Sequence, residues 1–249
     1  QELNLEYNDL ENLGEYAVRL AGWLAQCPEL KELNLGSNDL GNLGENAVPF
    51  AVALAASASL QSLDFGYNHL GSLGANAGPF VAALAGCASL QKLDLQSNEL
   101  GNLGANAEAF AAALARCSKL QKLNLNFNRL GELGEHAVLF AAALARCPSL
   151  QFLELMVNNL GRLGEDAARF AEALARCPSL QVLNLYGNNL EYWSNSNIHA
   201  SSLAGILTVS NDSENFKNLS VIKGLEGVYD EHPNIWRDVC HSLIIRAEK

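Results

Sequence analysis

Leucine and other apolar residues recur at fixed positions along most of this chain. The period is 30 residues, and it runs from Gln1 to Leu190 without an insertion or deletion. In the first third of each unit, for example in residues 92–95, apolar and polar side chains alternate. Alternation is typical of a short strand that buries one face. The pattern predicts six complete units and a seventh strand segment.

The last third of each unit is rich in alanine and has helical spacing. In Ala107–Cys117 the apolar residues lie three and four positions apart, on one face of a helix. Gly104 provides a turn before this helix, and Asn106 is a candidate cap for it. Each unit is therefore predicted to be a strand, a turn and an outer helix. Because one such unit cannot bury its own apolar face, neighbouring units must stack.

The segment Leu90-Gln-Lys-Leu93-Asp-Leu95-Gln-Ser-Asn98-Glu-Leu100 resembles the leucine-rich repeat. The alanine-rich tail of each unit is similar to that of the ribonuclease-inhibitor-like subtype. The resemblance covers residues 1–190 and implies an α/β solenoid. In such a solenoid, parallel strands line the concave face and helices form the convex face. The resemblance also implies a non-enzymatic protein–protein interaction module that binds a protein partner on its concave face.

The repeat stops after Leu190, where the expected glycine is replaced by Glu191. We expect residues 191–249 to form a mainly helical C-terminal cap with a final amphipathic helix at about 233–247. The alternative is that this last helix docks to a partner. Cys240 and His241 are adjacent on that helix, so their side chains point about 100° apart and are unsuited to nucleophilic catalysis. The chain starts at Gln1 without Met, so we expect further residues upstream.

Charge adds information about the partner. The formal net charge is −11, from 16 basic and 27 acidic side chains. Residues 1–90 hold two basic and ten acidic side chains, whereas residues 91–190 hold nine of each. This balance disfavours nucleic acid and membrane and favours a basic or mixed-charge protein partner. No apolar run approaches the length of a membrane helix. The oligomeric state is left open.

Cysteine occupies one column of the repeat, at positions 27, 87, 117, 147 and 177, with Ser57 in the remaining unit. Equivalent residues on stacked helices lie roughly 9–10 Å apart, which is too far for a disulfide or a tetrahedral zinc site. We therefore expect buried free thiols and a reducing compartment. The predicted location is the cytoplasm, or the host cytosol if the chain is a secreted bacterial effector.

Columns that are constant between units are expected to serve stacking. The asparagine column, from Asn8 to Asn188, can satisfy backbone groups of its own turn and of a neighbouring unit. A polar strand column brings Asp64 and Asp94 about 4.8 Å apart on adjacent strands. We interpret it as a polar ladder rather than a metal or acid–base site. No column offers a nucleophile, a base and an orienting group together, so no enzyme activity and no cofactor are expected.

Columns that vary between units are candidates for binding. In the last three units they hold apolar residues on neighbouring strands, and an exposed apolar area of that kind usually marks an interface. The alternative is that residues 191–249 fold back over this area. The predicted partner-binding residues on the concave face are Phe127, Phe152, Met156, Val157, Val182 and Tyr186, with Tyr67, Glu2, Glu6 and Glu32 nearer the N-terminus.

Two other functions stay open at the sequence level. One is regulation of an enzyme, as in Ran GTPase-activating proteins, which have a similar repeat type; Arg129 and Arg162 are the candidate residues for assisting phosphoryl transfer. The other is targeting of a catalytic domain in a larger effector or ligase.

Overall fold

A computed structural model describes residues 1–189 and 221–223. Its strands form one parallel sheet whose spatial order is the order of the chain. The predicted α/β leucine-rich solenoid is confirmed. The strands are β1 (Glu2–Asn4), β2 (Glu32–Asn34), β3 (Ser62–Asp64), β4 (Lys92–Asp94), β5 (Lys122–Asn124), β6 (Phe152–Glu154), β7 (Val182–Asn184) and β8 (Val221–Lys223).

The strand β8 was not expected from the sequence. It lies in the segment for which a mainly helical cap is predicted, and it pairs in parallel with β7, with Ile222 opposite Leu183. The helix predicted at about 233–247 lies outside the described residues. The division of the chain at residue 190 stays a prediction.

Each of the first six units continues from its strand through a 3₁₀ segment into an α-helix. The 3₁₀ segment begins at the repeated leucine, as at Leu100, and occupies the place where the sequence predicts only a turn. In the described part of the chain, no helix is both long and apolar enough to cross a bilayer. The helices are α1 (Glu15–Ala25), α2 (Ala47–Ala55), α3 (Ala77–Leu84), α4 (Ala107–Leu114), α5 (His136–Leu144) and α6 (Ala167–Ala175).

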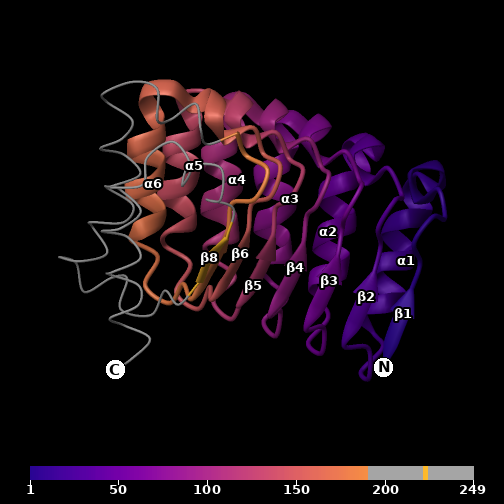
Figure 1. Ribbon diagram of the computed structural model, residues 1–249. Helices are drawn as coiled ribbons and strands as arrows, with labels where there is room; N and C mark the ends of the chain where they lie inside the picture. The colour runs from indigo at the N-terminus through magenta and orange to yellow at the C-terminus, as the bar shows by residue number, and fades with distance from the viewer. Residues whose placement is uncertain (190–220, 224–249) are drawn as a thin grey trace.

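Strands and helices lie on opposite sides of the stack (Figure 1). Paired strands are about 4.8 Å apart, whereas packed helices need about 8–10 Å. The strand side must therefore be the inner, concave side. The layer between them is the core, in which Phe50, Phe80, Phe110 and Phe140 have no exposed surface.

The asparagine column joins each unit to the one before it. Asn128 is fully buried, and its Oδ1 accepts hydrogen bonds from the backbone N–H groups of Asn98 (2.9 Å) and Leu100 (3.3 Å). Its Nδ2 donates to the carbonyl oxygens of Leu95 (2.8 Å) and Asn126 (3.1 Å). These are the backbone groups that a tight corner exposes inside a solenoid, so the expected structural role of this column is confirmed.

Two glycine positions are required by the backbone. Gly104 has φ 50° and ψ −127°, a region that residues with a Cβ rarely adopt, and it makes a kink inside the 3₁₀ segment Leu100–Asn106 that precedes α4. At Gly71, a Cβ would lie 2.1 Å from the carbonyl oxygen of Glu99 in the next unit. The expected cap at Asn106 is wrong in one respect: Asn106 precedes α4, but its side chain makes no capping hydrogen bond.

The cysteine column is mostly buried, as predicted, and its described members are free thiols. Burial raises the pKa of Cys87 and Cys117 to about 11 and that of Cys147 to about 12. Cys27 is the exception, because it is exposed. It lies just after α1, where no preceding unit covers it among the described residues, and Leu13 of the same unit is exposed for the same reason.

Candidate functional site

The concave face consists of three parallel rows of side chains. The first row is formed by the first residue of each strand from β1 to β7: Glu2, Glu32, Ser62, Lys92, Lys122, Phe152 and Val182. The middle row is formed by the third residue: Asn4, Asn34, Asp64, Asp94, Asn124, Glu154 and Asn184. The loop row lies two residues further on: Glu6, Gly36, Gly66, Gln96, Asn126, Met156 and Tyr186.

The middle row is mainly a structural device. In most of its residues, a side-chain oxygen accepts a hydrogen bond from the backbone N–H of the loop-row residue in the same unit. Gly66 N–H donates to Asp64 at 2.7 Å, and Gln96 N–H donates to Asp94 at 2.8 Å. The row also links its members sideways, because Asn124 Nδ2 donates to Asp94 Oδ2 at 2.7 Å. The predicted polar ladder is thus present in the structure.

Glu154 does not follow this pattern. Its side chain is one methylene longer than aspartate, and the N–H of Met156 instead donates to Asn126 Oδ1 of the preceding unit (2.6 Å). Glu154 Oε2 accepts from Asn184 Nδ2 at 2.6 Å. Asn126 therefore accepts the loop hydrogen bond that Glu154 does not accept, and the Asn126 side chain is almost fully buried.

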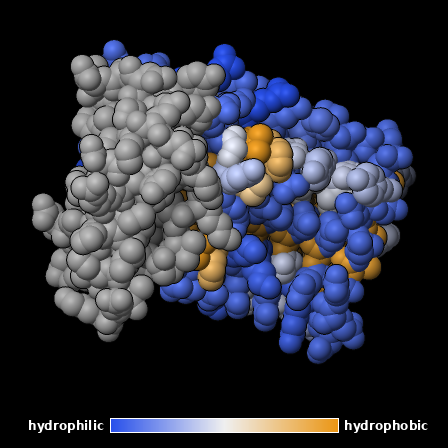
Figure 2. All heavy atoms as spheres, in the orientation of Figure 1, coloured by the Kyte–Doolittle hydropathy of each residue, from blue (hydrophilic) through white to orange (hydrophobic). Residues whose placement is uncertain are grey.

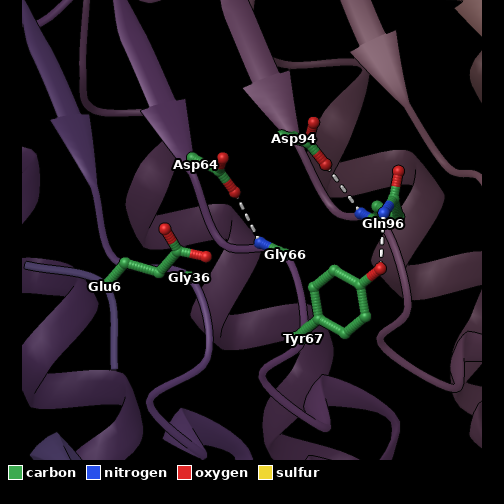
Figure 3. Close-up of a pocket in the computed structure, with 7 residues that line it drawn as sticks. All are labelled: Glu6, Gly36, Asp64, Gly66, Tyr67, Asp94 and Gln96. Atoms are coloured by element: carbon green, nitrogen blue, oxygen red, sulfur yellow. Dashed lines mark hydrogen bonds between the residues drawn. The ribbon is translucent and has the colours of Figure 1, made fainter. Parts of the chain in front are cut away.

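A small acidic pocket lies at the N-terminal half of the loop row (Figure 3). Glu6, Asp64 and Asp94 supply carboxylates, and Gly36 and Gly66 provide space because they have no side chains. Tyr67 forms one wall, where its hydroxyl accepts a hydrogen bond from Gln96 Nε2 at 2.9 Å. The pocket is therefore shaped by two glycines of the loop row, at positions where the other units have side chains.

The surroundings of Asp64 in this pocket oppose its ionisation. Burial raises the pKa of Asp64, and the nearby carboxylates of Asp94 and Glu6 raise it further, against the hydrogen bond from Gly66 N–H, which lowers it. A positive charge placed in the pocket would remove the repulsion.

The apolar candidates form two groups rather than one continuous area. Phe127, Met156, Val157 and Tyr186 lie in the loops after β5, β6 and β7, where the N–H of Phe127 donates to the carbonyl of Met156 and that of Val157 to the carbonyl of Tyr186. Phe127 is 43% exposed and Tyr186 57% exposed. Figure 2 shows an island of hydrophobic surface over these loops within a mostly hydrophilic face.

The second group is the pair Phe152 and Val182, which are neighbours in the first row. Phe152 is 37% exposed. The polar side chains of Glu154 and Asn184 lie between this pair and the loop group, because the middle row separates the first row from the loop row. The structure thus brings the six apolar residues onto neighbouring units but divides them by a polar strip.

The remaining candidates lie toward the N-terminus. Glu2 and Glu32 are exposed neighbours in the first row, whereas Glu6 and Tyr67 line the acidic pocket. Arg162 forms an ion pair with Glu132 (3.5 Å), and Arg129 lies exposed in a loop with φ 57°. Within residues 1–189, no group of three His, Cys, Asp or Glu side chains is arranged to hold a metal ion.

Comparison with known families agrees with this geometry. A family model described as "Leucine Rich repeat" matches residues 26–44, 56–77, 86–107 and 116–134. Each matched segment contains one strand and the 3₁₀ segment after it. The chain contains leucine-rich repeats.

One solved structure that resembles this leucine-rich repeat chain is the leucine-rich repeat-containing protein LegL7 from Legionella pneumophila. It is 23% identical, the match covers 98% of this chain and 79% of that chain, and the TM-score is 0.48. A search of curated proteins finds no significant match.

Proposed function

We propose that this leucine-rich repeat chain is a non-enzymatic module that binds a protein partner on its concave face. Leucine-rich repeats generally mediate protein–protein interaction, and the observation that supports the concave face here is the exposure of aromatic side chains on it. Phe127, Phe152 and Tyr186 lie on three successive units and are each at least 37% exposed. Exposed aromatic side chains gathered on one surface are the usual anchors of protein interfaces.

The site we propose consists of the loop group and the Phe152–Val182 pair as anchors, with Tyr67 and the acidic residues Glu2, Glu6 and Glu32 beside them. The anchors should supply most of the affinity, because truncating a buried aromatic anchor typically weakens binding by about 1–3 kcal/mol. The acidic residues should mainly accelerate association with a basic or mixed-charge partner. Residues 191–249 would cap the end of the solenoid.

A peptide selection tests this proposal without a known partner. Binders would be selected from a random-peptide phage library with the full 249-residue chain as bait, and their affinity measured for Phe152→Ala, Tyr186→Ala and Leu139→Ala. Leu139 is the matched control, since it is an equally exposed apolar residue (45%) on α5, at the helix side. We expect the two concave variants to lose at least about fivefold in affinity, equivalent to 1 kcal/mol, and Leu139→Ala to lose none.

Thermal melts of the same variants separate binding from intramolecular cover. Phe152→Ala should leave the melting temperature nearly unchanged, because the side chain does not belong to the core. If Phe152→Ala lowers the melting temperature and leaves binding intact, the C-terminal segment covers this surface and the proposal is wrong. Loss of binding in Leu139→Ala alone would place the site on the helices.

We further propose the ribonuclease-inhibitor-like subtype and a reducing compartment such as the cytoplasm. The four buried, unpaired thiols of the cysteine column support the second point, because disulfides are common in oxidising compartments.

A further inference from the structure

The first row of the concave face is sorted by chemistry. Going from β1 to β7, it begins with two glutamates, passes the small neutral Ser62, continues with two lysines and ends with two apolar residues. The register places each residue directly beside its equivalent in the next strand. The row is therefore a linear sequence of an acidic, a basic and an apolar pair.

This sorting does not serve the fold. Glu2 lies opposite Glu32, and Lys92 lies opposite Lys122. Like charges directly opposite each other destabilise a sheet, and alternating charges in the same row would stabilise it. In residues 1–189, none of these four side chains has an ion-pair partner within 4.0 Å, whereas Arg162 and Glu132 of adjacent units do pair elsewhere on the solenoid.

Asp64 and Asp94 line the same pocket as Lys92 and Lys122, but within the described residues no carboxylate oxygen lies within 4.0 Å of either ammonium group. Asp64 and Asp94 lie in the middle row, about 6.6 Å further along the strands. Both oxygens of Asp94 already accept hydrogen bonds, from Gln96 N–H at 2.8 Å and from Asn124 Nδ2 at 2.7 Å. The exposed ammonium groups of Lys92 and Lys122 are thus available to a carboxylate from outside.

We infer that the first row binds an extended segment of the partner that crosses the strands and carries a basic, an acidic and an apolar feature in that spatial order. This inference rests on the proposed function and specifies the chemistry of the partner. Each feature complements one pair: basic over Glu2 and Glu32, acidic over Lys92 and Lys122, apolar over Phe152 and Val182. The order follows from charge complementarity alone.

The spacing of the strands sets the spacing of these features. The acidic and basic pairs are three strands apart, or about 14 Å, and the basic and apolar pairs are two strands apart, or about 10 Å. An extended peptide rises about 3.3 Å per residue. The partner segment therefore has its acidic feature about four residues from the basic one and its apolar feature about three residues beyond. Either chain direction satisfies this geometry.

Designed peptides test the inference. The probe is the fluorescently labelled nonapeptide Arg-Arg-Ser-Ser-Glu-Glu-Ser-Leu-Phe, together with its reversed sequence, because the chain direction is open. Each feature has two adjacent residues, since only alternate side chains face the sheet. The control, Glu-Glu-Ser-Ser-Arg-Arg-Ser-Leu-Phe, and its own reversed sequence have the same composition and net charge but the wrong order of charges. Binding to the full chain is measured by fluorescence anisotropy at low salt.

The matched protein variant exchanges the two charged pairs: Glu2→Lys, Glu32→Lys, Lys92→Glu and Lys122→Glu. It keeps the net charge of the protein and the like-charged pairs within the first row, whereas the order of the pairs is reversed. We expect the natural chain to bind the probe, in one of its directions, about three- to tenfold more tightly than either control peptide, and the exchanged variant to show the opposite preference. Both preferences should shrink with added salt.

Equal affinities for probe and control, a preference that does not reverse in the exchanged variant, or no binding of any peptide would each overturn the inference. The proposed function would survive these results if library-selected peptides still lost affinity in Phe152→Ala and Tyr186→Ala. The two experiments therefore distinguish a wrong order of partner charges from a concave face that does not bind partners.

Discussion

Replacing Asn128 by alanine tests the physical role of the asparagine column. The change removes four hydrogen bonds at once, two accepted by Oδ1 and two donated by Nδ2. The carbonyl of Asn126 keeps a second partner in the N–H of Ser97 (2.9 Å). The N–H groups of Asn98 and Leu100 and the carbonyl of Leu95 are left buried without the partner that the side chain supplied.

The expected magnitude follows from these three groups. A buried donor or acceptor without a partner costs about 1–3 kcal/mol, and water entering the vacated space would offset part of it. We therefore expect Asn128→Ala to lower the free energy of unfolding by about 3–5 kcal/mol. Asn8 is the matched control from the same column. It is exposed, and its side chain donates one hydrogen bond, to Glu6. Asn8→Ala should cost about 0.5 kcal/mol or less.

Urea unfolding followed by far-ultraviolet circular dichroism measures both values. Because repeat arrays can unfold in parts, amide hydrogen exchange should accompany the melts and show faster exchange of the Leu100 amide in Asn128→Ala. If the two alanine variants were equally stable, the column would not carry the cohesion between units that we assign to it.

Two further outcomes are expected. In the native protein at pH 8, brief iodoacetamide labelling with peptide mapping should modify Cys27 but not Cys147, whose pKa is raised to about 12 by burial; equal labelling would contradict the buried column. Asp64→Asn should stabilise the protein at pH 7. A folded-state pKa above the ordinary value means that ionised Asp64 opposes folding, so the gain should vanish as pH falls through that pKa. Asparagine keeps the hydrogen bond to the loop row, as Asn34 does; a gain that persists at low pH would assign the effect to packing.

The repeat made most of the fold predictable. A constant period fixes the strand register, the buried leucines and the buried asparagines, because equivalent residues must meet equivalent residues when units stack. It also gives the composition of each concave row. The partner-binding residues predicted from the variable columns are still predictions, but their places on the solenoid follow from the period.

Other features depend on particular atoms and could not be predicted in this way. Within the polar strip, Glu154 accepts a hydrogen bond from Asn184 instead of from its own loop, and Asn126 accepts the Met156 N–H in its place. The acidic pocket depends on two glycines meeting three carboxylates. Cys27 is exposed because it lies in the first unit, whereas the repeat pattern alone predicts that all cysteines of the column are buried.

The asparagine bonds also bear on how such a protein can change its length. The bonds between units connect residues that are about one period apart, for example Asn98 N–H to Asn128 Oδ1 and Asn128 N–H to Asn158 Oδ1. If one whole unit were duplicated or lost, every asparagine would meet an equivalent partner at the new junction, whereas a change of any other length would mismatch them. Unequal recombination can therefore lengthen or shorten the binding surface by one strand at a time while the fold persists.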